Sequence, residues 1–263
     1  MFHDRAAETV EQNVVFDRTD HVHAAREKME DALAQRLGQA LPARYRLLHD
    51  GERGALDACA QARRRLKGRV LSLLCRCDRM EGAGLAIAQY RHATGMTDRL
   101  SALRALLRSR AVQSQEALRD FRSRFDGKPL ALDKWFALQA QVPSQETLER
   151  VQALARDPAF QLRNPNRVQA LFGAFARGNP VGFHRPDGAG YRFVAARLTE
   201  IDALNPQNAA RLAKAFESWR TLEPRRREEA HSVLLDLNGL GMSADLAEVM
   251  ERMLWEETAG PNG

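Results

Sequence analysis

The sequence has little of what marks a disulfide-stapled or membrane protein. Its three cysteines, Cys59, Cys75 and Cys77, are an odd number without the spacing of a disulfide framework or a zinc ribbon. We therefore expect reduced and mostly buried thiols. No stretch approaches the roughly 20 apolar residues that cross a bilayer, and no apolar segment of the signal-peptide kind follows residues 1–5. These absences predict a cytoplasmic protein without membrane contacts.

Motifs that carry catalysis are missing as well. Neither the zinc motif H-E-x-x-H nor the nucleophile motif G-x-S-x-G occurs in the 263 residues. His21 and His23 form H-x-H, but a catalytic zinc needs three protein ligands. Gly188-Ala189-Gly190 lacks the preceding strand and the Lys-Ser/Thr ending of a phosphate loop. The residues alone therefore predict a helical binding or structural domain with no catalytic and no metal-binding residues of its own.

Composition is that of an ordinary globular protein with an excess of positive charge. Hydrophobic residues make up 44% and charged residues 28% of the chain, and the net charge is +6. Basic runs occur at 63–69 and 225–227, and the second is followed at once by Glu228 and Glu229. Neither run has the interleaved aromatic residues that stack on bases. We therefore expect solvated helix faces, and nucleic-acid binding through 63–69 is the weakest alternative.

Helical periodicity covers most of the chain. Apolar residues recur at intervals of three or four over 24–41, 98–111 and 164–177. We expect Thr97 or Asp98 to cap the second of these helices. The apolar positions of the three ranges are Met29, Leu33, Leu37 and Leu41, then Leu100, Leu103, Leu106 and Leu107, then Val168, Leu171, Phe172 and Phe175.

Several helix starts can be read from cap residues. Asn164-Pro165 and Asn205-Pro206 combine a capping side chain with proline at the first helical position, where its missing N–H costs nothing. Glu223-Pro224 and Ser243 mark two further starts, and 185–190 is expected to be one loop between two helices. Asn164, Asn179 and Asn205 are therefore predicted caps. The large aromatic residues are predicted core, namely Trp135, Phe136, Phe172, Phe175 and Trp219.

These patterns predict an all-α fold. The two Asn-Pro starts lie 41 residues apart, and helical-pair repeats of the HEAT and armadillo types have periods of roughly 40 to 47 residues. No credible alternating strand pattern is present. We expect a superhelical array of stacked antiparallel helix pairs, an α-solenoid of the HEAT or armadillo kind.

Short matching segments in a fixed order connect the chain to a family. They include Leu132–Ala140, Asn164–Arg167, Gly173–Ala176, Asp187–Tyr191 and Asn205–Gln207. With Gly95–Asp98, Asn179-Pro180 and Phe183-His184, they resemble the C-terminal helical domain of bacterial aminopeptidase N, a zinc metallopeptidase. The resemblance extends weakly back to about Phe16. We therefore expect residues 16–263 to form one C-terminal α-helical domain, preceded by a poorly matched segment at 1–15.

The resemblance carries expectations about function. It implies that zinc, the only cofactor, belongs to a separate catalytic domain and that this chain closes the substrate cavity over it. The partners would then be that catalytic domain and a peptide substrate losing its N-terminal residue. By position, Gln207 and Arg211 would bind the substrate, and four residues apart on a helix they share one face. The family often has a second arginine two residues beyond Arg167, but Gln169 stands there.

Two alternatives stay open at this point, the nucleic-acid binding through 63–69 already described and a role in binding another protein. The chain could be a free-standing α-solenoid that binds a protein partner. The same side chains would then be ordinary features of a helical surface, with Gln207 and Arg211 solvated.

Overall fold

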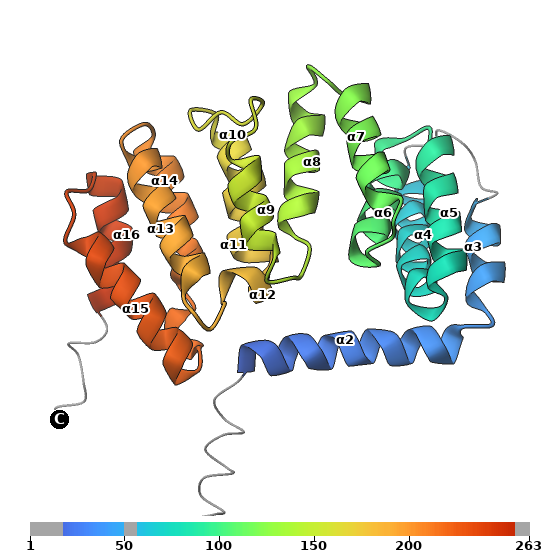
Figure 1. Cartoon of the computed structure of the whole chain (residues 1–263), viewed down its shortest axis with the longest axis horizontal. Helices are drawn as coiled ribbons and strands as arrows, with labels where there is room; N and C mark the ends of the chain where they lie inside the picture. The colour runs from blue at the N-terminus through green and yellow to red at the C-terminus, as the bar shows by residue number, and fades with distance from the viewer. Residues whose placement is uncertain (1–17, 50–56, 256–263) are drawn as a thin grey trace, which may run out of the picture. The chain divides into compact units, whose positions relative to one another are not determined.

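The structure, a computed structural model, describes residues 18–49 and 57–255 (Figure 1). Within these ranges the regular elements are all helices, and no strand occurs, which confirms the predicted all-α class. None of the described helices is long and apolar enough to cross a membrane. The chain forms two compact units, Ala24–Leu138 and the combination of Met1–His23 with Gln139–Gly263. The boundary expected between residues 15 and 16 lies outside the described residues.

The unit of Ala24–Leu138 is built around three helices that contact one another. These are α4 (Ala58–Cys77), α5 (Arg79–His92) and α6 (Met96–Arg108) (Figure 1). A Cβ atom added at Gly82 of α5 would lie 2.5 Å from Cα of Cys75, so glycine allows α4 and α5 to cross closely. The remaining helices are α2 (Arg18–Leu37, most of which belongs here), α3 (Leu41–His49), α7 (Ser114–Arg124) and α8 (Pro129–Ala140).

Helix α2 differs from the helix expected at 24–41. It begins earlier and ends at Leu37, and Leu41 opens α3 instead. Of the apolar stripe, Leu41 is buried, whereas Met29, Leu33 and Leu37 are 57%, 39% and 43% exposed. The inward side of α2 is charged, since Glu30 is only 7% exposed. The apolar spacing correctly predicted a helix, but its apolar face is not part of the core.

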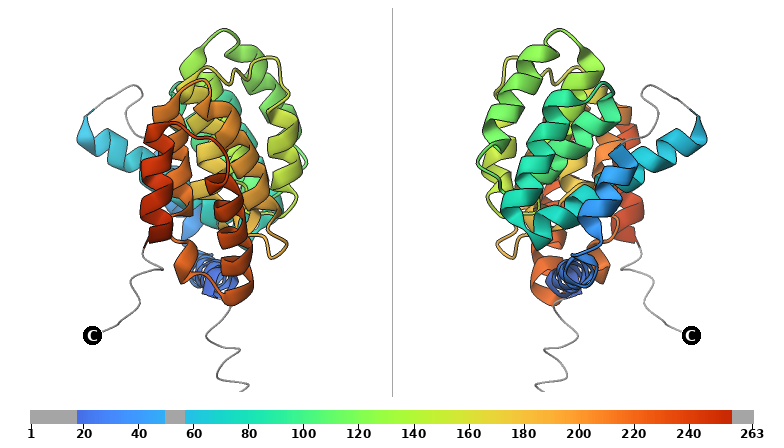
Figure 2. Two further views of the ribbon diagram at one scale, coloured as in Figure 1. Left: turned by 90° about the vertical axis from the view of Figure 1, so that its left-hand side faces the viewer. Right: turned by 90° about the vertical axis from the view of Figure 1, so that its right-hand side faces the viewer.

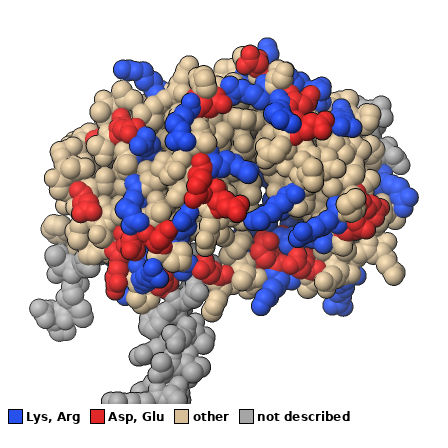
Figure 3. All heavy atoms as spheres, viewed as in Figure 1, with Lys and Arg blue, Asp and Glu red and all other residues tan. Residues whose placement is uncertain are grey.

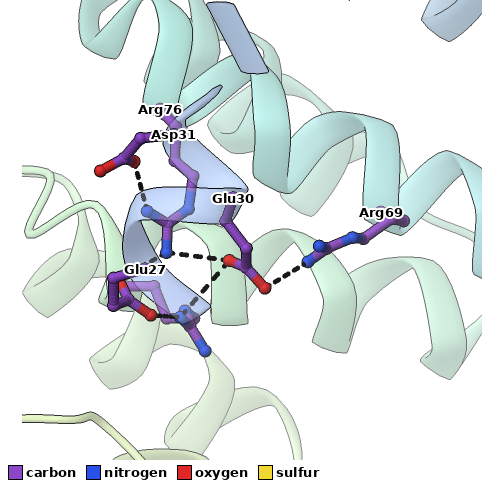
Figure 4. A network of polar contacts seen from close by, with 6 residues as sticks. Glu27, Glu30, Asp31, Arg69 and Arg76 are labelled. Atoms are coloured by element: carbon purple, nitrogen blue, oxygen red, sulfur yellow. Dashed lines mark hydrogen bonds and ion pairs between the residues drawn. The ribbon is translucent and has the colours of Figure 1, made fainter. Parts of the chain in front are cut away.

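An ion-pair network holds the inward side of α2 against α4 (Figure 4). Glu30 contacts Arg69 at 3.0 Å and Arg76 at 2.9 Å. Arg76 also reaches Glu27 and Asp31, each at 2.5 Å. Arg108 of α6 joins Glu27 at 2.8 Å and Glu30 at 3.8 Å. On this side of the helix, charge pairing accompanies the burial of the small apolar residue Ala34, which is 1% exposed.

The helix expected at 98–111 is α6, and its ends differ from the prediction. Gly95 occupies the N-cap position without a side-chain hydrogen bond, so neither Thr97 nor Asp98 is the cap. Asp98 instead pairs with the buried Lys67 at 2.7 Å. The helix ends at Arg108, with Arg110 in a left-handed conformation at φ 53° shortly after it. Leu103, Leu106 and Leu107 are buried as expected.

In the second unit, the helices near the C-terminus pack against one another. Figures 1 and 2 show α13 (Ala189–Asp202) and α14 (Pro206–Ala213) beside α15 (Pro224–Asn238) and α16 (Ala244–Trp255), and the pairs α13–α14, α13–α15 and α14–α16 are in contact. The remaining elements are α9 (Thr147–Leu154), α10 (Pro165–Val168), a π-helical turn η1 (Gln169–Gly173), α11 (Ala174–Gly178), α12 (Pro180–Phe183) and the 3₁₀ turns η2 (Lys214–Phe216) and η3 (Trp219–Thr221).

The predicted caps are confirmed. Asn164, Asn179 and Asn205 accept hydrogen bonds from backbone N–H groups at the starts of α10, α12 and α14. Glu223 does the same for α15, and the Ser243 hydroxyl accepts from the N–H of Leu246. The predicted loop at 185–190 is shorter than expected, because α13 already begins at Ala189. Gly188, at φ 66°, makes the left-handed turn before it.

The predicted aromatic core is confirmed as well. Trp135, Phe136, Phe172, Phe175 and Trp219 are all at most 8% exposed. Phe183 is a centre of this packing, with its ring 5.2 Å from the rings of both Tyr191 and Phe216. The expectation for the cysteines is wrong in part, since Cys75 is buried but Cys59 and Cys77 are exposed.

Candidate functional site

The two residues predicted to bind substrate lie on the short helix α14. Asn205 caps this helix through a hydrogen bond from the N–H of Asn208, and Pro206 takes the first helical position. Gln207 and Arg211 are both exposed, and their spacing of four residues puts them on one face. Gln207 has no side-chain hydrogen bond to the described part of the chain. Both side chains are therefore available to a ligand.

The neighbouring helix is interrupted by a π-helical turn. Residues Gln169–Gly173 form it between α10 and α11 (Figure 1). Residues eight apart in a regular α-helix differ in direction by about 80°. A π turn inserts the equivalent of one residue, which brings such a pair back to one face. Gln169 and Arg177 are this pair, and their side chains meet, with Nη2 of Arg177 2.5 Å from Oε1 of Gln169.

Gly173 makes room for that contact. A Cβ atom at this position would lie 2.5 Å from Nη2 of Arg177 and 2.7 Å from Oε1 of Gln169. Its backbone is ordinary right-handed helix, at φ −65° and ψ −39°, so the glycine is needed for space rather than for conformation. The combination of a π turn and a glycine is what places Arg177 over Gln169.

A series of hydrogen bonds from Arg177 through Gln169 to Asn208 fixes the orientation of both side-chain amides. Arginine can only donate, so Oε1 of Gln169 must face Arg177. Its Nε2 then donates to Oδ1 of Asn208 at 2.8 Å. The Nδ2 donor of Asn208 is left buried and without a hydrogen-bond partner in the described part of the chain, and Asn208 is only 6% exposed. A buried donor of this kind is uncommon, and its N–H groups add partial positive charge at the start of α14.

Arg177 and Arg211 form a pair of like charges. Nη1 of Arg177 lies 3.5 Å from the backbone oxygen of Arg211. Partial burial and then the charge of Arg211 lower the pKa of Arg177. Among the residues that the structure describes, no carboxylate forms an ion pair with either side chain. The four side chains of Gln169, Arg177, Asn208 and Arg211 are here called the arginine site.

Two of these residues were not found from the sequence. Gln207 and Arg211 came from the family resemblance, whereas Arg177 and Asn208 lie at positions that no motif marks. One signal was present: Gly173 stands inside an apolar helical pattern, and an isolated glycine there usually has a packing or functional reason. Gln169, noted as a departure from the family, turns out to connect Arg177 to Asn208.

Other candidate groups have structural partners. His184 donates to or accepts from the hydroxyl of Tyr191 at 2.9 Å, and Arg226 contacts its backbone oxygen at 2.6 Å. Burial and the charge of Arg226 lower the pKa of His184 to about 4. The described residues contain no group of three His, Cys, Asp or Glu that could hold a metal ion.

The basic run at 63–69 is partly neutralised. Lys67 pairs with Asp98, and Arg69 pairs with Glu30. On the face drawn in Figure 3, lysine and arginine lie among aspartate and glutamate rather than in a patch of one sign. Nucleic-acid binding through this run stays the weakest alternative.

Comparisons with known proteins cover nearly the whole chain. A family model described as "Domain of unknown function (DUF3458_C) ARM repeats" matches residues 5–255. Aminopeptidase N of Caulobacter vibrioides is 36% identical over 203 residues, which are 77% of this chain and 24% of the relative. Aminopeptidase N of Escherichia coli is 32% identical over 243 residues, 91% of this chain and 28% of the relative.

A solved structure agrees with these relatives. It is Legionella pneumophila aminopeptidase A in complex with aspartic acid, which matches with a TM-score of 0.83 and 28% identity. The match covers 90% of this chain and 29% of that chain. The chain thus spans about a quarter of the length of the curated relatives it matches.

Proposed function

Because this chain belongs to the ARM-repeat family DUF3458_C and is a helical domain of the aminopeptidase N type, we propose that it closes the substrate cavity of such an enzyme. In this role it acts with a catalytic half that removes N-terminal residues from peptides. The observation that carries the proposal is the match over nearly the whole chain to about a quarter of each relative. Residues 16–263 are the proposed domain.

Catalysis is assigned to the other half. Zinc there, when bound, would activate a water and polarise the scissile carbonyl. This chain's contribution is to orient the peptide and limit what enters the cavity. Gln207 supplies an amide that can pair with a peptide group, and Arg211 supplies a planar guanidinium for a carbonyl or carboxylate oxygen. The aspartic acid bound to the Legionella relative is a ligand of this chemistry, with carboxylates that a guanidinium recognises.

The outer side of α2 is the proposed contact with the catalytic half. Met29, Leu33 and Leu37 form an exposed apolar stripe, while the charged side of the helix is held inward by Arg69, Arg76 and Arg108. A surface helix normally has the reverse arrangement. An apolar stripe turned outward fits a face that another domain covers.

The test is reconstitution with a separately expressed catalytic half of a related aminopeptidase N. We expect the two to co-elute and to turn over alanyl-p-nitroanilide faster than the catalytic half alone. Leu33→Asp on α2 should abolish the joint peak, because it puts a charge in the apolar stripe. The matched control is Leu130→Asp on α8, which changes an equally apolar side chain that is 73% exposed.

The substrate role of Arg211 is tested in the joint peak. Arg211→Ala should lower kcat/KM for a peptide by about tenfold, the usual scale for one lost charged hydrogen bond. Arg227→Ala on α15 is the control, because Arg227 is exposed as well. Separate elution with unchanged turnover would overturn the proposal and favour the free-standing interaction module.

A further inference from the structure

We propose that Arg177 and Arg211 together bind a carboxylate of the peptide, with the buried Nδ2 donor of Asn208, which is linked to Arg177 through Gln169, adding to the positive potential. The identity of the ligand as a peptide rests on the proposed function. The anion site itself rests on the described residues alone.

Three arginines of this unit show how a guanidinium is neutralised when carboxylates are nearby. Arg185 pairs with Glu149 and Asp187, Arg192 with Glu229, and Arg226 with Asp20 and Glu223. Arg177 instead approaches the backbone of Arg211, and its side chain is directed there by Gln169. The charges that balance the other guanidiniums are not supplied here by the described residues. A bound anion would supply them.

Three side chains of the arginine site, Gln169, Arg177 and Asn208, are connected by hydrogen bonds before any ligand arrives. The π turn and the hydrogen bond to Gln169 hold the Arg177 side chain, Gln169 also bonds to Asn208, and α14 fixes the backbone position of Arg211. Arg177 therefore loses little side-chain freedom on binding, which is the cost that usually weakens exposed ion pairs. The Arg177 guanidinium reaches the backbone of Arg211 and its pKa is lowered by partial burial and then by the Arg211 charge, so both planar sets of donors are near enough to serve one carboxylate. The neutral amides in the site offer no competing negative charge.

The carboxylate has two possible sources within a peptide, its C-terminus or an acidic side chain. Both present the same group, so the probes must separate them. Three tripeptides do so: tri-alanine, tri-alaninamide and Asp-Ala-Ala-amide. The first has only a C-terminal carboxylate, the second has none, and the third has only a side-chain carboxylate.

Binding is measured on the full 263-residue chain alone, by NMR titration of the side-chain Nε–H signals of arginine. We expect the signals of Arg177 and Arg211 to shift with a carboxylate-bearing tripeptide. Tri-alaninamide should bind about tenfold more weakly, the scale of one charged hydrogen bond. A shift with tri-alanine alone identifies the C-terminus as the source, and a shift with Asp-Ala-Ala-amide alone identifies the side chain.

Variants separate the site from a general effect of charge. Arg177→Gln should weaken binding by about tenfold, while Arg227→Gln, which removes the same charge from an exposed position on α15, should not. Asn208→Asp is a second variant, chosen so that a loss of binding cannot be attributed to misfolding. An acidic residue three positions beyond the cap favours the helix, so this variant should fold. Its added negative charge should still abolish binding.

Equal binding of all three tripeptides, or unchanged binding in Arg177→Gln, would overturn the inference. The outcome is independent of reconstitution, because no catalytic half is present. Carboxylate binding without co-elution would reject the proposed function and keep the site. Co-elution without carboxylate binding would support the proposed function and reject the carboxylate site.

Discussion

The guanidinium of Arg177 and the side-chain amide of Gln169 meet at 2.5 Å, although the two residues are eight positions apart in neighbouring helical segments. The π turn brings them to one face, and Gly173 leaves the space between them. This contact decides where one of the two charges of the arginine site lies. The backbone conformation at the π turn therefore controls the position of the Arg177 guanidinium and, through it, the proposed binding.

Replacing Gly173 with alanine tests that control. The backbone at Gly173 is right-handed helix, so alanine should not strain it and should raise helix stability by up to about 1 kcal/mol. The new Cβ would collide with the far ends of two flexible side chains, which must move apart. We expect unchanged or higher thermal stability together with weaker carboxylate binding, measured by calorimetry and by the NMR titration. Lower stability with intact binding would contradict this reading of the π turn.

Asn164 and Asn179 look alike in sequence, but they should differ in importance. Asn164 only caps α10, and its loss should cost about 1 kcal/mol. Asn179 is fully buried, caps α12, and also donates to the backbone oxygens of Ala140 and Val142 at 3.1 and 2.7 Å. Asn179→Ala should therefore cost about 3 kcal/mol, since two carbonyls lose their donor. Urea unfolding of both variants gives the comparison, and equal costs would refute it.

Much of the fold could be predicted because its signals are local. A capping asparagine or glutamate followed by proline fixes a helix start within a few residues, and Asn164, Asn205 and Glu223 all do so. Apolar spacing correctly predicted the buried residues Val168, Leu171, Phe172 and Phe175. These signals depend on the nearest turn of helix, so no knowledge of the rest of the chain is needed.

The features that sequence reasoning missed depend on contacts between elements. The apolar stripe of α2 predicted an amphipathic helix, but the buried side of this helix carries Glu30, which meets three arginines from α4 and α6. Arg177 is placed by a π turn, which no spacing rule anticipates. Asn208 matters only because Gln169 fixes its amide direction. Each of these depends on a partner far away in sequence or on a local break in helical phase.

His184 should make stability depend on pH. Burial and then the charge of Arg226 lower its pKa to about 4 in the folded chain, below the usual value of about 6.5 for the unfolded chain. Between these values the unfolded chain binds the extra proton and the folded chain does not. The free energy of unfolding should therefore fall as the pH decreases from about 6.5 to about 4, by up to about 1.4 kcal/mol per pH unit.

His184→Gln isolates this contribution. Glutamine can still bond to the hydroxyl of Tyr191, which lies 2.9 Å from Nδ1 of His184, but it does not titrate. Denaturant unfolding at several pH values should show a smaller slope for the variant than for the original chain in this window. Identical slopes would mean that His184 is protonated in the folded chain as readily as in the unfolded one.

Glu30 is the carboxylate on which the position of α2 depends most. Its burial raises its pKa, but the hydrogen bond from Arg69 and the charges of Arg69, Arg76 and Arg108 outweigh this, so that the net pKa is lowered. Glu30→Gln keeps the shape and removes the charge, which leaves three guanidiniums with less to balance them. We expect a loss of about 2 kcal/mol in the free energy of unfolding, which is less than for a fully buried ion pair because the side chains of Arg69 and Arg108 are 46% and 34% exposed.

Glu116→Gln is the matched control, because Glu116 also pairs with an arginine but both side chains are largely exposed. Its cost should stay below about 1 kcal/mol. The lowered pKa of Glu30 adds a second test: its contribution is present above the ordinary carboxylate range and is lost as the pH falls below it. The cost of Glu30→Gln should therefore shrink in acid. A cost that is equal to that of Glu116→Gln, or that does not change with pH, would show that apolar contacts rather than this network hold α2 in place.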